Sequence, residues 1–432
     1  MTSTLTDKFV KGLIAKSQKI PQHVIDQAKK CLLDYIGVTV GGARLLEREQ
    51  SEFLNQFQDE RGDCSIIGTE QKTTVYNAAL LNGYAAHVLE LDDGHRIGMI
   101  HLGASIISAI ISVGEKEDLS MQEMLIGIVM GYETAVRCAC ALQPGHKERG
   151  YHVSGTCGAI GSAIGIGFAC RYSEQQLLST LACAVTSAAG VLEIQEDASE
   201  LKPYNLGRAA MDGVAAAYMG RVGLRGPDDI LGGKRGLLTV LTHDAKTSFL
   251  EDFSIGKYCI EGIYQKVYAA CRHCHPAIEA ALVLREKYKI DVCDIEKIEV
   301  RTYRLAVGGH DHKTVKGLSS AKLSTPYSVA LALTKGNAGY DDFCLKNVQD
   351  DVILRLAEKI DVVVDEELTA ISPAIRAAEV CIRTRKTAYH HRVDYPKGEP
   401  ENPLTFSDIS KKTELLVSDY HNDYIDSILK MI

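Results

Sequence analysis

Apolar residues recur at three- and four-residue spacing through most of the chain between about residues 22 and 245. This spacing places apolar side chains along one face of an α-helix, and few segments here show the alternation typical of strands. The uncharged stretch from Val153 to Cys170 is rich in Gly, Ser and Ala, so we expect a buried helix there rather than a membrane span. The pattern predicts further helices over residues 24–35, 78–89, 105–113, 121–142, 176–192 and 209–222.

The pattern changes after the segment GPDDILGGKRG. Polar and apolar residues alternate over 296–306 and 377–393, which predicts half-buried strands. Helical spacing returns over 275–288, 328–335 and 350–357, and the segment DYPKGEPENPL is typical of a connection. Residues 407–432 again favour helix and are expected to return to the first domain.

These patterns predict a mainly α protein. A chain of 432 residues exceeds the roughly 250 to 300 residues at which a single core stops growing, so two domains are expected. We predict a large all-helical domain and a smaller α+β domain. The first would comprise residues 1–257 and 398–432, and the second residues 258–397.

Composition excludes several classes of function. Hydrophobic residues make up 46% of the chain and charged residues 24%, as in ordinary globular proteins. The net charge is -8 without any dense Lys/Arg block, so neither nucleic acid nor a membrane surface is an expected partner. The 13 scattered cysteines and the absence of a secretory signal pattern favour a reducing, cytoplasmic location.

Four clusters carry groups that transfer protons or bind carboxylates. The first spans residues 87–101 and contains Glu90, Asp92, Asp93 and His101. Burial and mutual repulsion at a helix end shift such pKa values toward neutrality. The alternative is a solvated acidic turn without a catalytic role. The spacing of these residues does not distinguish such a turn from a proton-transfer site.

The second cluster is a histidine at the start of a helix, and the third places a lysine among apolar residues. His152 precedes the glycine-rich helix, where exposed N–H groups attract anions; Ser154 as an ordinary N-cap is the alternative. Lys202 lies in an otherwise apolar region, so it needs a partner, which is either a substrate carboxylate or a structural salt bridge.

The fourth cluster is the dense run from Lys266 to Pro276, which contains Cys271, Arg272 and His275. Its C-x-x-C spacing with interleaved histidines suggests a metal or redox site. A zinc ribbon needs a second ligand pair and an iron–sulfur cluster needs more cysteines, so we expect no metal and no cofactor.

In chain order, these clusters resemble the MmgE/PrpD family, which includes 2-methylcitrate dehydratase, cis-aconitate decarboxylase and iminodisuccinate epimerase. The resemblance covers nearly the whole chain and rests on seven segments. They read NGYAAHVLELDDGHRIGMIHLGA, GYHVSGTCG, LKPYNLGRAAMDGVAAA, RGPDDILGG, KVYAACRHCHPAIEA, AKLSTPYSVALAL and PENPLT.

The resemblance implies a helical domain, an α+β lid, a homodimer and an active site in the cleft between the domains. By similarity, the acidic turn at Asp92 and Asp93 belongs to that site. The residues that the resemblance carries over are His101, His152, Lys202, Lys266, Cys271 and Tyr327.

The expected activity is cofactor-independent proton transfer next to a carboxylate of a small di- or tricarboxylic acid, most simply a lyase like 2-methylcitrate dehydratase. Lys202, Lys266 and Arg272 would hold carboxylates, His101 or His152 would move the proton, and Tyr327 would donate one. We also assign Asp93 to catalysis. Substrate binding would involve Glu90, Asp92, Lys266, Cys271, Arg272 and His275.

Several alternatives stay open at this stage. They are a decarboxylase, an epimerase, a metal hydrolase and a non-catalytic carboxylate-binding protein. Three departures argue against a simple cis-aconitate decarboxylase: Glu90-Leu-Asp92-Asp93-Gly94 replaces the Asp-Phe-Asp-Asp-Thr pattern, Leu102 replaces Pro, and Cys271 replaces His.

Overall fold

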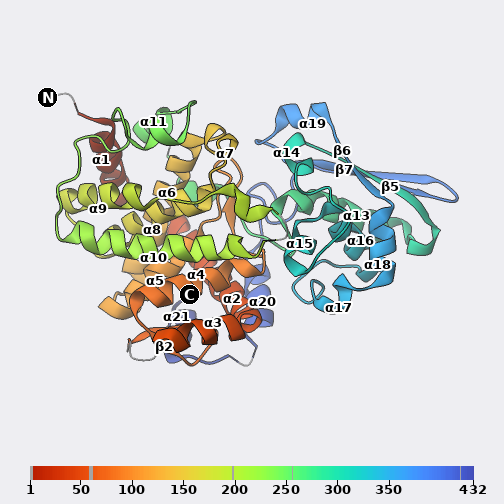
Figure 1. The fold of residues 1–432 in the computed structure, drawn as a ribbon, viewed down its shortest axis with the longest axis horizontal. Coiled ribbons are helices and arrows are strands. Elements are labelled where there is room, and N and C mark those ends of the chain that lie inside the picture. Colours follow the sequence, from red (N-terminus) through yellow and green to blue (C-terminus); the bar gives the residue numbers. More distant parts are fainter. Residues whose placement is uncertain (1–2, 58–61, 197–198, 255, 419) are drawn as a thin grey trace.

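The computed structural model describes residues 3–57, 62–196, 199–254, 256–418 and 420–432. Figure 1 shows a helical body beside a smaller α+β part, with the chain leaving the body and returning to it at its C-terminal end. The body also contains a short hairpin of β1 (Cys64–Ser65) and β2 (Lys72–Thr73) and a short antiparallel pair of β3 (Gly94–His95) and β4 (Ile263–Tyr264), two strands that lie far apart in the chain. Short 3₁₀ helices pack with the body, namely η1 (Asn55–Phe57), η2 (Leu192–Gln195) and η3 (Cys259–Gly262). Its helices are α1 (Leu5–Ser17), α2 (Gln22–Leu45), α3 (Glu47–Leu54), α4 (Val75–Val88), α5 (Gly103–Glu117), α6 (Met121–Leu142), α7 (Gly145–Glu148), α8 (Val153–Ala169), α9 (Glu174–Ser187), α10 (Leu201–Arg221), α11 (Leu237–Leu241), α12 (Ser248–Glu251), α20 (Phe406–Val417) and α21 (Asp423–Met431).

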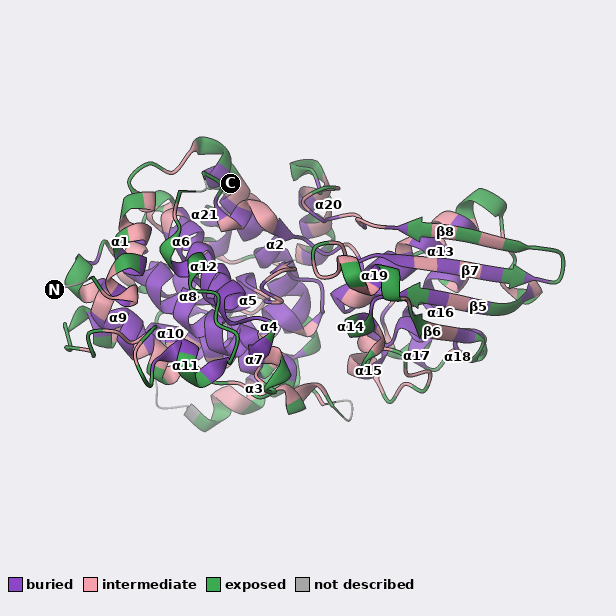
Figure 2. Ribbon diagram, turned by 90° about the horizontal axis from the view of Figure 1, so that it is seen from above, coloured by how far each residue is buried: buried purple, intermediate pink, exposed green. Residues whose placement is uncertain are grey.

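Helices α6 and α8 cross closely in the centre of the body. Ser120 begins α6 with a reciprocal cap, in which its hydroxyl accepts from the Glu123 N–H and the Glu123 carboxylate accepts from the Ser120 N–H. A Cβ atom at Gly161 would lie 2.8 Å from the Gly131 carbonyl oxygen, so only glycine permits this approach. Helix α6 is apolar and long enough to cross a membrane, but 94% of its most apolar window is buried inside the protein (Figure 2).

The smaller part contains a four-stranded sheet in the order β6-β5-β7-β8. Strand β5 (Ile295–Thr302) runs parallel to β6 (Ile360–Val364) and antiparallel to β7 (Ala378–Thr384), which forms a hairpin with β8 (Ala388–Val393); Figure 2 shows the four strands side by side. Helices pack on one face, and the opposite face exposes charged side chains. The helices of this part are α13 (His275–Tyr288), α14 (Arg304–Val307), α15 (Leu318–Leu323), α16 (Thr325–Lys335), α17 (Leu345–Val348), α18 (Asp351–Glu358) and α19 (Glu366–Ile371), with 3₁₀ turns η4 (Arg272–Cys274) and η5 (Val292–Asp294).

The fold class predicted from the sequence is confirmed: the protein is mainly α with a smaller α+β part. The predicted helices at 121–142 and 275–288 match α6 and α13, and the predicted strand region 377–393 is the β7–β8 hairpin. Two predictions were wrong in detail. Residues 303–306 leave the sheet and enter α14, and the helix predicted to residue 192 already ends at Ser187.

The two largest hydrophobic cores correspond broadly to the two parts of the molecule. The larger core draws on the body, including Ile425 and Ile428 of α21, while the second draws mainly on residues from Tyr268 to Val393. Helix α20 packs against α2, where the Thr413 hydroxyl donates to the Leu33 carbonyl oxygen at 3.0 Å (Figure 1). The α+β part is therefore held at both of its ends by the helical body, and we call it the lid.

Candidate active site

A cavity of about 80 Å³ lies where the body meets the lid. Pockets for drug-sized ligands usually measure about 300 to 1,000 Å³, so this cavity suits a small metabolite. Its body wall includes His101 before α5, His152 at the start of α8, and Lys202 in the first turn of α10. Its lid wall includes Cys271 and Arg272 at η4. The fold thus brings together five of the residues predicted from the sequence.

His152 is oriented by Asn205 of α10. The Nδ1 atom of His152 lies 2.7 Å from Oδ1 of Asn205, so Nδ1 carries the proton and Nε2 keeps a free lone pair. Asn205 comes this close because residue 155 is glycine: a Cβ there would lie 2.1 Å from the same Oδ1. Burial lowers the pKa of His152 to about 3. His152 is therefore a neutral base with its tautomer set.

His101 is also held as a neutral imidazole with its proton on Nδ1. Its Nδ1 atom donates to the backbone oxygen of Asp93 at 2.9 Å and lies 3.3 Å from the carboxylate of Asp92. Its backbone N–H donates to the Ser154 hydroxyl at 3.0 Å, which joins the first and second sequence clusters. Burial lowers the pKa of His101 to about 4, although Asp92 opposes the shift. The cavity thus contains two neutral imidazoles.

Glu90 is the centre of a buried ion-pair network behind the cavity. Its backbone adopts φ 52°, a left-handed conformation that is uncommon for residues other than glycine. One carboxylate oxygen pairs with Lys202, and the other lies 2.9 Å from Nζ of Lys266. Burial raises the pKa of Glu90, but the two lysines and His87 outweigh it and hold the pKa well below its usual range. Glu90 therefore neutralises both lysines.

Asp92 extends this network toward His101. Its Oδ2 atom lies 2.8 Å from Nδ1 of His87, and its Oδ1 atom lies 3.6 Å from Nζ of Lys266. Burial favours the neutral acid, yet His87, His101 and Lys266 together lower its pKa well below the usual value. Glu90, Asp92 and Lys266 do not line the cavity among the described residues, so their expected direct contact with substrate finds no support in this arrangement.

Arg272 and His275 form a second buried group. The Arg272 guanidinium pairs with the Glu399 carboxylate at 2.6 Å and lies 2.9 Å from Nδ1 of His275. Nε2 of His275 lies 3.1 Å from the Ala270 carbonyl oxygen. Both ring nitrogens of His275 are therefore occupied, and it acts on the cavity only by positioning Arg272.

Two of the residues predicted to be catalytic lie away from the cavity wall. Asp93 accepts from the Tyr132 hydroxyl at 2.6 Å and from the Gly103 N–H at 2.9 Å, and burial raises its pKa to about 7. It reaches the site through its backbone bond to His101. Tyr327 is fully buried in the lid core, where its ring packs against Phe343 and its hydroxyl finds no partner among the described residues. The structure does not bring Tyr327 to the cavity, because α16 places it on the core face of the lid.

The cavity also contains two cations that the sequence analysis missed. Lys147 comes from α7, and Arg376, which is 6% exposed, comes just before β7. Neither pairs with a carboxylate among the described residues; the Arg376 guanidinium donates only to the Arg96 carbonyl oxygen. Burial, with Arg376 nearby, lowers the pKa of Lys147. No motif marks either residue, since each becomes a site residue only through the fold.

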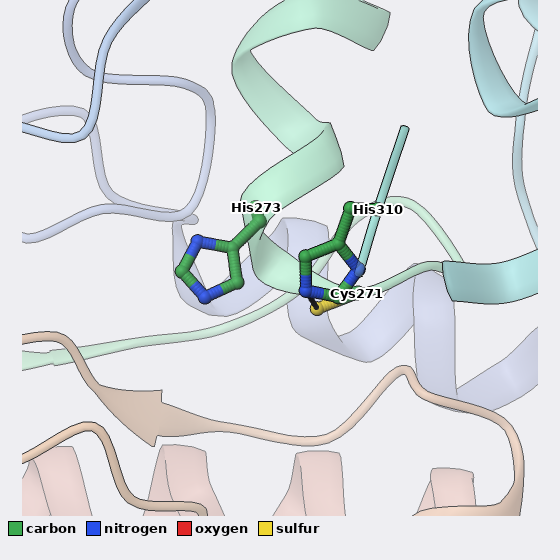
Figure 3. Close-up of side chains that lie close together, drawn as sticks. All are labelled: Cys271, His273 and His310. Carbon is green, nitrogen blue, oxygen red and sulfur yellow. Dashed lines mark hydrogen bonds between the residues drawn. The ribbon is translucent and has the colours of Figure 1, made fainter. Parts of the chain in front are cut away.

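The lid wall adds a cluster of metal-ligand type. Figure 3 shows His310 and Cys271 pointing toward one another, with His273 beside them. Their possible ligand atoms lie within 4.8 Å of one another, as do those of His87, Asp92 and His101. The His-x-His sequence at residues 310–312 follows a Gly-Gly turn, which is a signal that the sequence analysis did not use.

A helical body and an α+β lid enclose neutral histidines and two cations that have no carboxylate partner among the described residues, an arrangement typical of enzymes. Comparison with family models agrees with this class. The MmgE/PrpD N-terminal domain matches residues 8–250, and the MmgE/PrpD C-terminal domain matches residues 268–426. The chain belongs to the MmgE/PrpD family.

Curated relatives are similar over different shares of the chain. A cis-aconitate decarboxylase-like protein, oryM, of Aspergillus oryzae is 25% identical over 93% of this chain and 88% of its own length. Cis-aconitate decarboxylase of Aspergillus terreus is 25% identical over 62% of this chain and 57% of its own length. The Homo sapiens cis-aconitate decarboxylase is 23% identical over 54% of this chain and 49% of its own length. These relatives support an enzyme of lyase type and do not single out 2-methylcitrate dehydration.

Proposed function

We propose that the protein is a lyase that moves a proton beside a carboxylate of a small di- or tricarboxylic acid. The observation that carries this proposal is the pairing pattern in the cavity. Lys202 and Arg272 already have carboxylate partners, whereas Lys147 and Arg376 have none among the described residues. Two unpaired cations in a small, largely buried cavity favour an anionic ligand with more than one carboxylate.

The chemistry follows from the state of the histidines. A carboxylate held by Lys147 and Arg376 makes the neighbouring C–H bond more acidic, because the cations stabilise the negative charge that develops as the proton leaves. Nε2 of His152 is free to accept that proton, and a bound polyanion raises the low pKa of this imidazole. His101 is available to return it. Base catalysis of this kind contributes about 10² to 10⁴ in rate.

Two finer reactions compete within this proposal. Decarboxylation has the support of the relatives, which are named as cis-aconitate decarboxylase or as cis-aconitate decarboxylase-like. Dehydration like that of 2-methylcitrate rests on the sequence motifs. It also rests on Cys271, because the decarboxylases that this chain resembles have His at this position. An epimerase would abstract the same proton and then return a proton to the opposite face of the same carbon atom.

An activity screen tests the proposal. The purified protein is incubated in deuterium oxide with 2-methylcitrate, citrate, cis-aconitate and iminodisuccinate, and deuterium uptake, alkene absorbance and carbon dioxide release are followed. We expect exchange or turnover with at least one acid. Binding of an acid without exchange of any proton would favour a non-catalytic binding protein instead. Turnover that is lost with a chelator and restored by a metal would favour a metal hydrolase.

The assembly and location are proposed from resemblance and composition alone. We propose a homodimer that works in the cytoplasm, with domain boundaries near residues 257/258 and 397/398. Light scattering after gel filtration measures the mass in solution. Limited proteolysis tests the boundaries, because cleavage concentrates where few contacts cross between domains.

A further inference from the structure

The lid wall of the cavity contains a thiol and an imidazole in contact. Sγ of Cys271 lies 3.8 Å from Nε2 of His310 (Figure 3). Both residues line the cavity. Cys271 ends the loop before η4, and His310 lies in the segment between α14 and α15. The pair faces the body wall, which includes His101 and His152.

The backbone of the lid sets the tautomer of His310. Nδ1 of His310 lies 2.8 Å from the Leu323 carbonyl oxygen, which only accepts, so Nδ1 carries a proton. Nε2 is then free to accept the proton of the Cys271 thiol. The Thr325 N–H donates to the His310 carbonyl oxygen at 2.8 Å and holds the segment in place.

The surrounding charges favour transfer of this proton from sulfur to nitrogen. Burial disfavours a thiolate, but His310 and then Lys202 outweigh burial and lower the pKa of Cys271, while Glu90 opposes them. The same contact raises the pKa of His310 against burial. The other groups that face the pair are the cations Lys147 and Arg376 and the neutral imidazole of His273. Cys274, three residues later, has no imidazole partner in the described part of the chain, and burial raises its pKa.

Cys271, His273 and His310 together are poorly suited to binding a divalent metal ion. Nδ1 of His273 lies 2.6 Å from the Tyr303 hydroxyl, and its pKa falls well below the usual value through burial and nearby Arg376. Lys147, Lys202 and Arg376 line the same cavity. These cations repel a second positive charge at this position, whereas they attract a carboxylate.

We propose that Cys271 is a second proton-transfer group, positioned by His310, which acts on the substrate from the lid side while His152 acts from the body side. This proposal rests on the proposed function. When the Cys271 thiolate is the base, its own proton is held by Nε2 of His310; the substrate C–H bond breaks, an S–H bond forms, and the electron pair moves into the neighbouring carboxylate as an enediolate. When the pair is the acid, the same proton returns to carbon or leaves with the departing oxygen as water.

The test uses the full chain with three variants: Cys271→Ser, His310→Gln and the control Cys381→Ser. Cys381 is a matched control because its Sγ lies 3.6 Å from Nε2 of His390 on the exposed sheet face, outside the cavity. Alkylation of each cysteine by iodoacetamide is followed against pH by mass spectrometry, and circular dichroism verifies the fold. This readout needs no substrate.

We expect Cys271 to react at a pH below the ordinary thiol pKa of about 8.5, and His310→Gln to move its midpoint up toward that value. With a substrate from the acid screen, Cys271→Ser is expected to lower kcat by about 10²-fold or more with little change in KM. Cys381→Ser is expected to match the unaltered protein.

Three results would overturn the proposal. They are an unchanged alkylation midpoint in His310→Gln, full turnover in folded Cys271→Ser, and activity that a chelator removes and zinc restores. Failure of the proposed function looks different, because no acid would then exchange protons in the unaltered protein. The alkylation midpoint would still decide whether Cys271 and His310 form the reactive pair.

Discussion

Nδ1 of His152 lies 2.7 Å from Oδ1 of Asn205, and this contact leaves Nε2 of the imidazole as an acceptor at the cavity wall. His152 immediately precedes α8 and Asn205 lies in α10, and the close approach of these two segments depends on glycine at position 155. The contact therefore couples the packing of the body to the protonation state of the proposed base.

His152→Gln is expected to lower kcat by about 10² to 10⁴-fold, because glutamine keeps the approximate size but cannot accept the proton. Asn205→Ala is expected to lower kcat by a smaller factor, since the imidazole remains but loses its fixed tautomer. Both are measured by steady-state turnover and deuterium exchange. If His152→Gln and Lys202→Ala both turn over the substrate normally, the site is wrongly assigned.

Replacing Lys147 or Arg376 is expected to weaken substrate binding. Lys147→Met and Arg376→Gln each remove one unpaired cation, and hydrogen bonds to charged groups contribute about 1.5 to 3 kcal/mol, so KM should rise about 10- to 100-fold. The matched controls are Lys234→Met and Arg383→Gln at exposed positions. Unchanged KM in both cavity variants would contradict the assignment of these cations to substrate carboxylates.

Tyr327→Phe is expected to leave kcat within about threefold of the unaltered value, well short of the factors typical of lost acid–base catalysis. Its hydroxyl is buried without a hydrogen-bond partner among the described residues, so removal should leave the free energy of unfolding unchanged or slightly higher. Urea unfolding and turnover check both points. A loss of turnover by about 100-fold or more would show that the lid rearranges and brings this phenol to the substrate.

Glu90→Gln is expected to lower the free energy of unfolding by about 3 to 5 kcal/mol, because Lys202 and Lys266 would lose a buried countercharge. The control is Glu366→Gln, which breaks an exposed pair with Arg304 and should cost less than about 1 kcal/mol. Urea unfolding near neutral pH measures both variants. An equal loss of stability in the two variants would mean that the buried ion-pair network around Glu90 does not stabilise the fold.

Stability is expected to fall as the pH drops from about 6.5 toward 4. Burial lowers the pKa of His95, His101 and His146 to about 4 and that of His152 to about 3, so the unfolded chain binds protons that the folded chain does not. Asp93 acts in the opposite direction, because its raised pKa of about 7 lets the folded chain keep a proton. His152→Gln should reduce the loss between about pH 6.5 and 5 by about 2 kcal/mol, as measured by urea unfolding across this range. An equally steep loss in the variant would contradict the neutral state of His152.

Long helices could be predicted because local spacing encodes them. Residues 121–142 and 275–288 have apolar faces and clear end signals, and the structure places α6 and α13 there. Strand β6 was missed because Ile360 follows the end of α18 at Glu358 almost directly, so the short apolar run has no turn signal before it. Its status as a strand depends on pairing with β5, which precedes it by about 60 residues.

The sequence by itself determined the fold class, the family and the kinds of group available for proton transfer, because these depend on local periodicity and on motifs in chain order. Only the tertiary structure decided which charges are already neutralised. Glu90 meets Lys202 and Lys266, while Lys147 and Arg376 meet no carboxylate among the described residues. Electrostatic partners are set by distance in space and by burial, and neither quantity is visible in residues that lie more than a hundred positions apart in the chain.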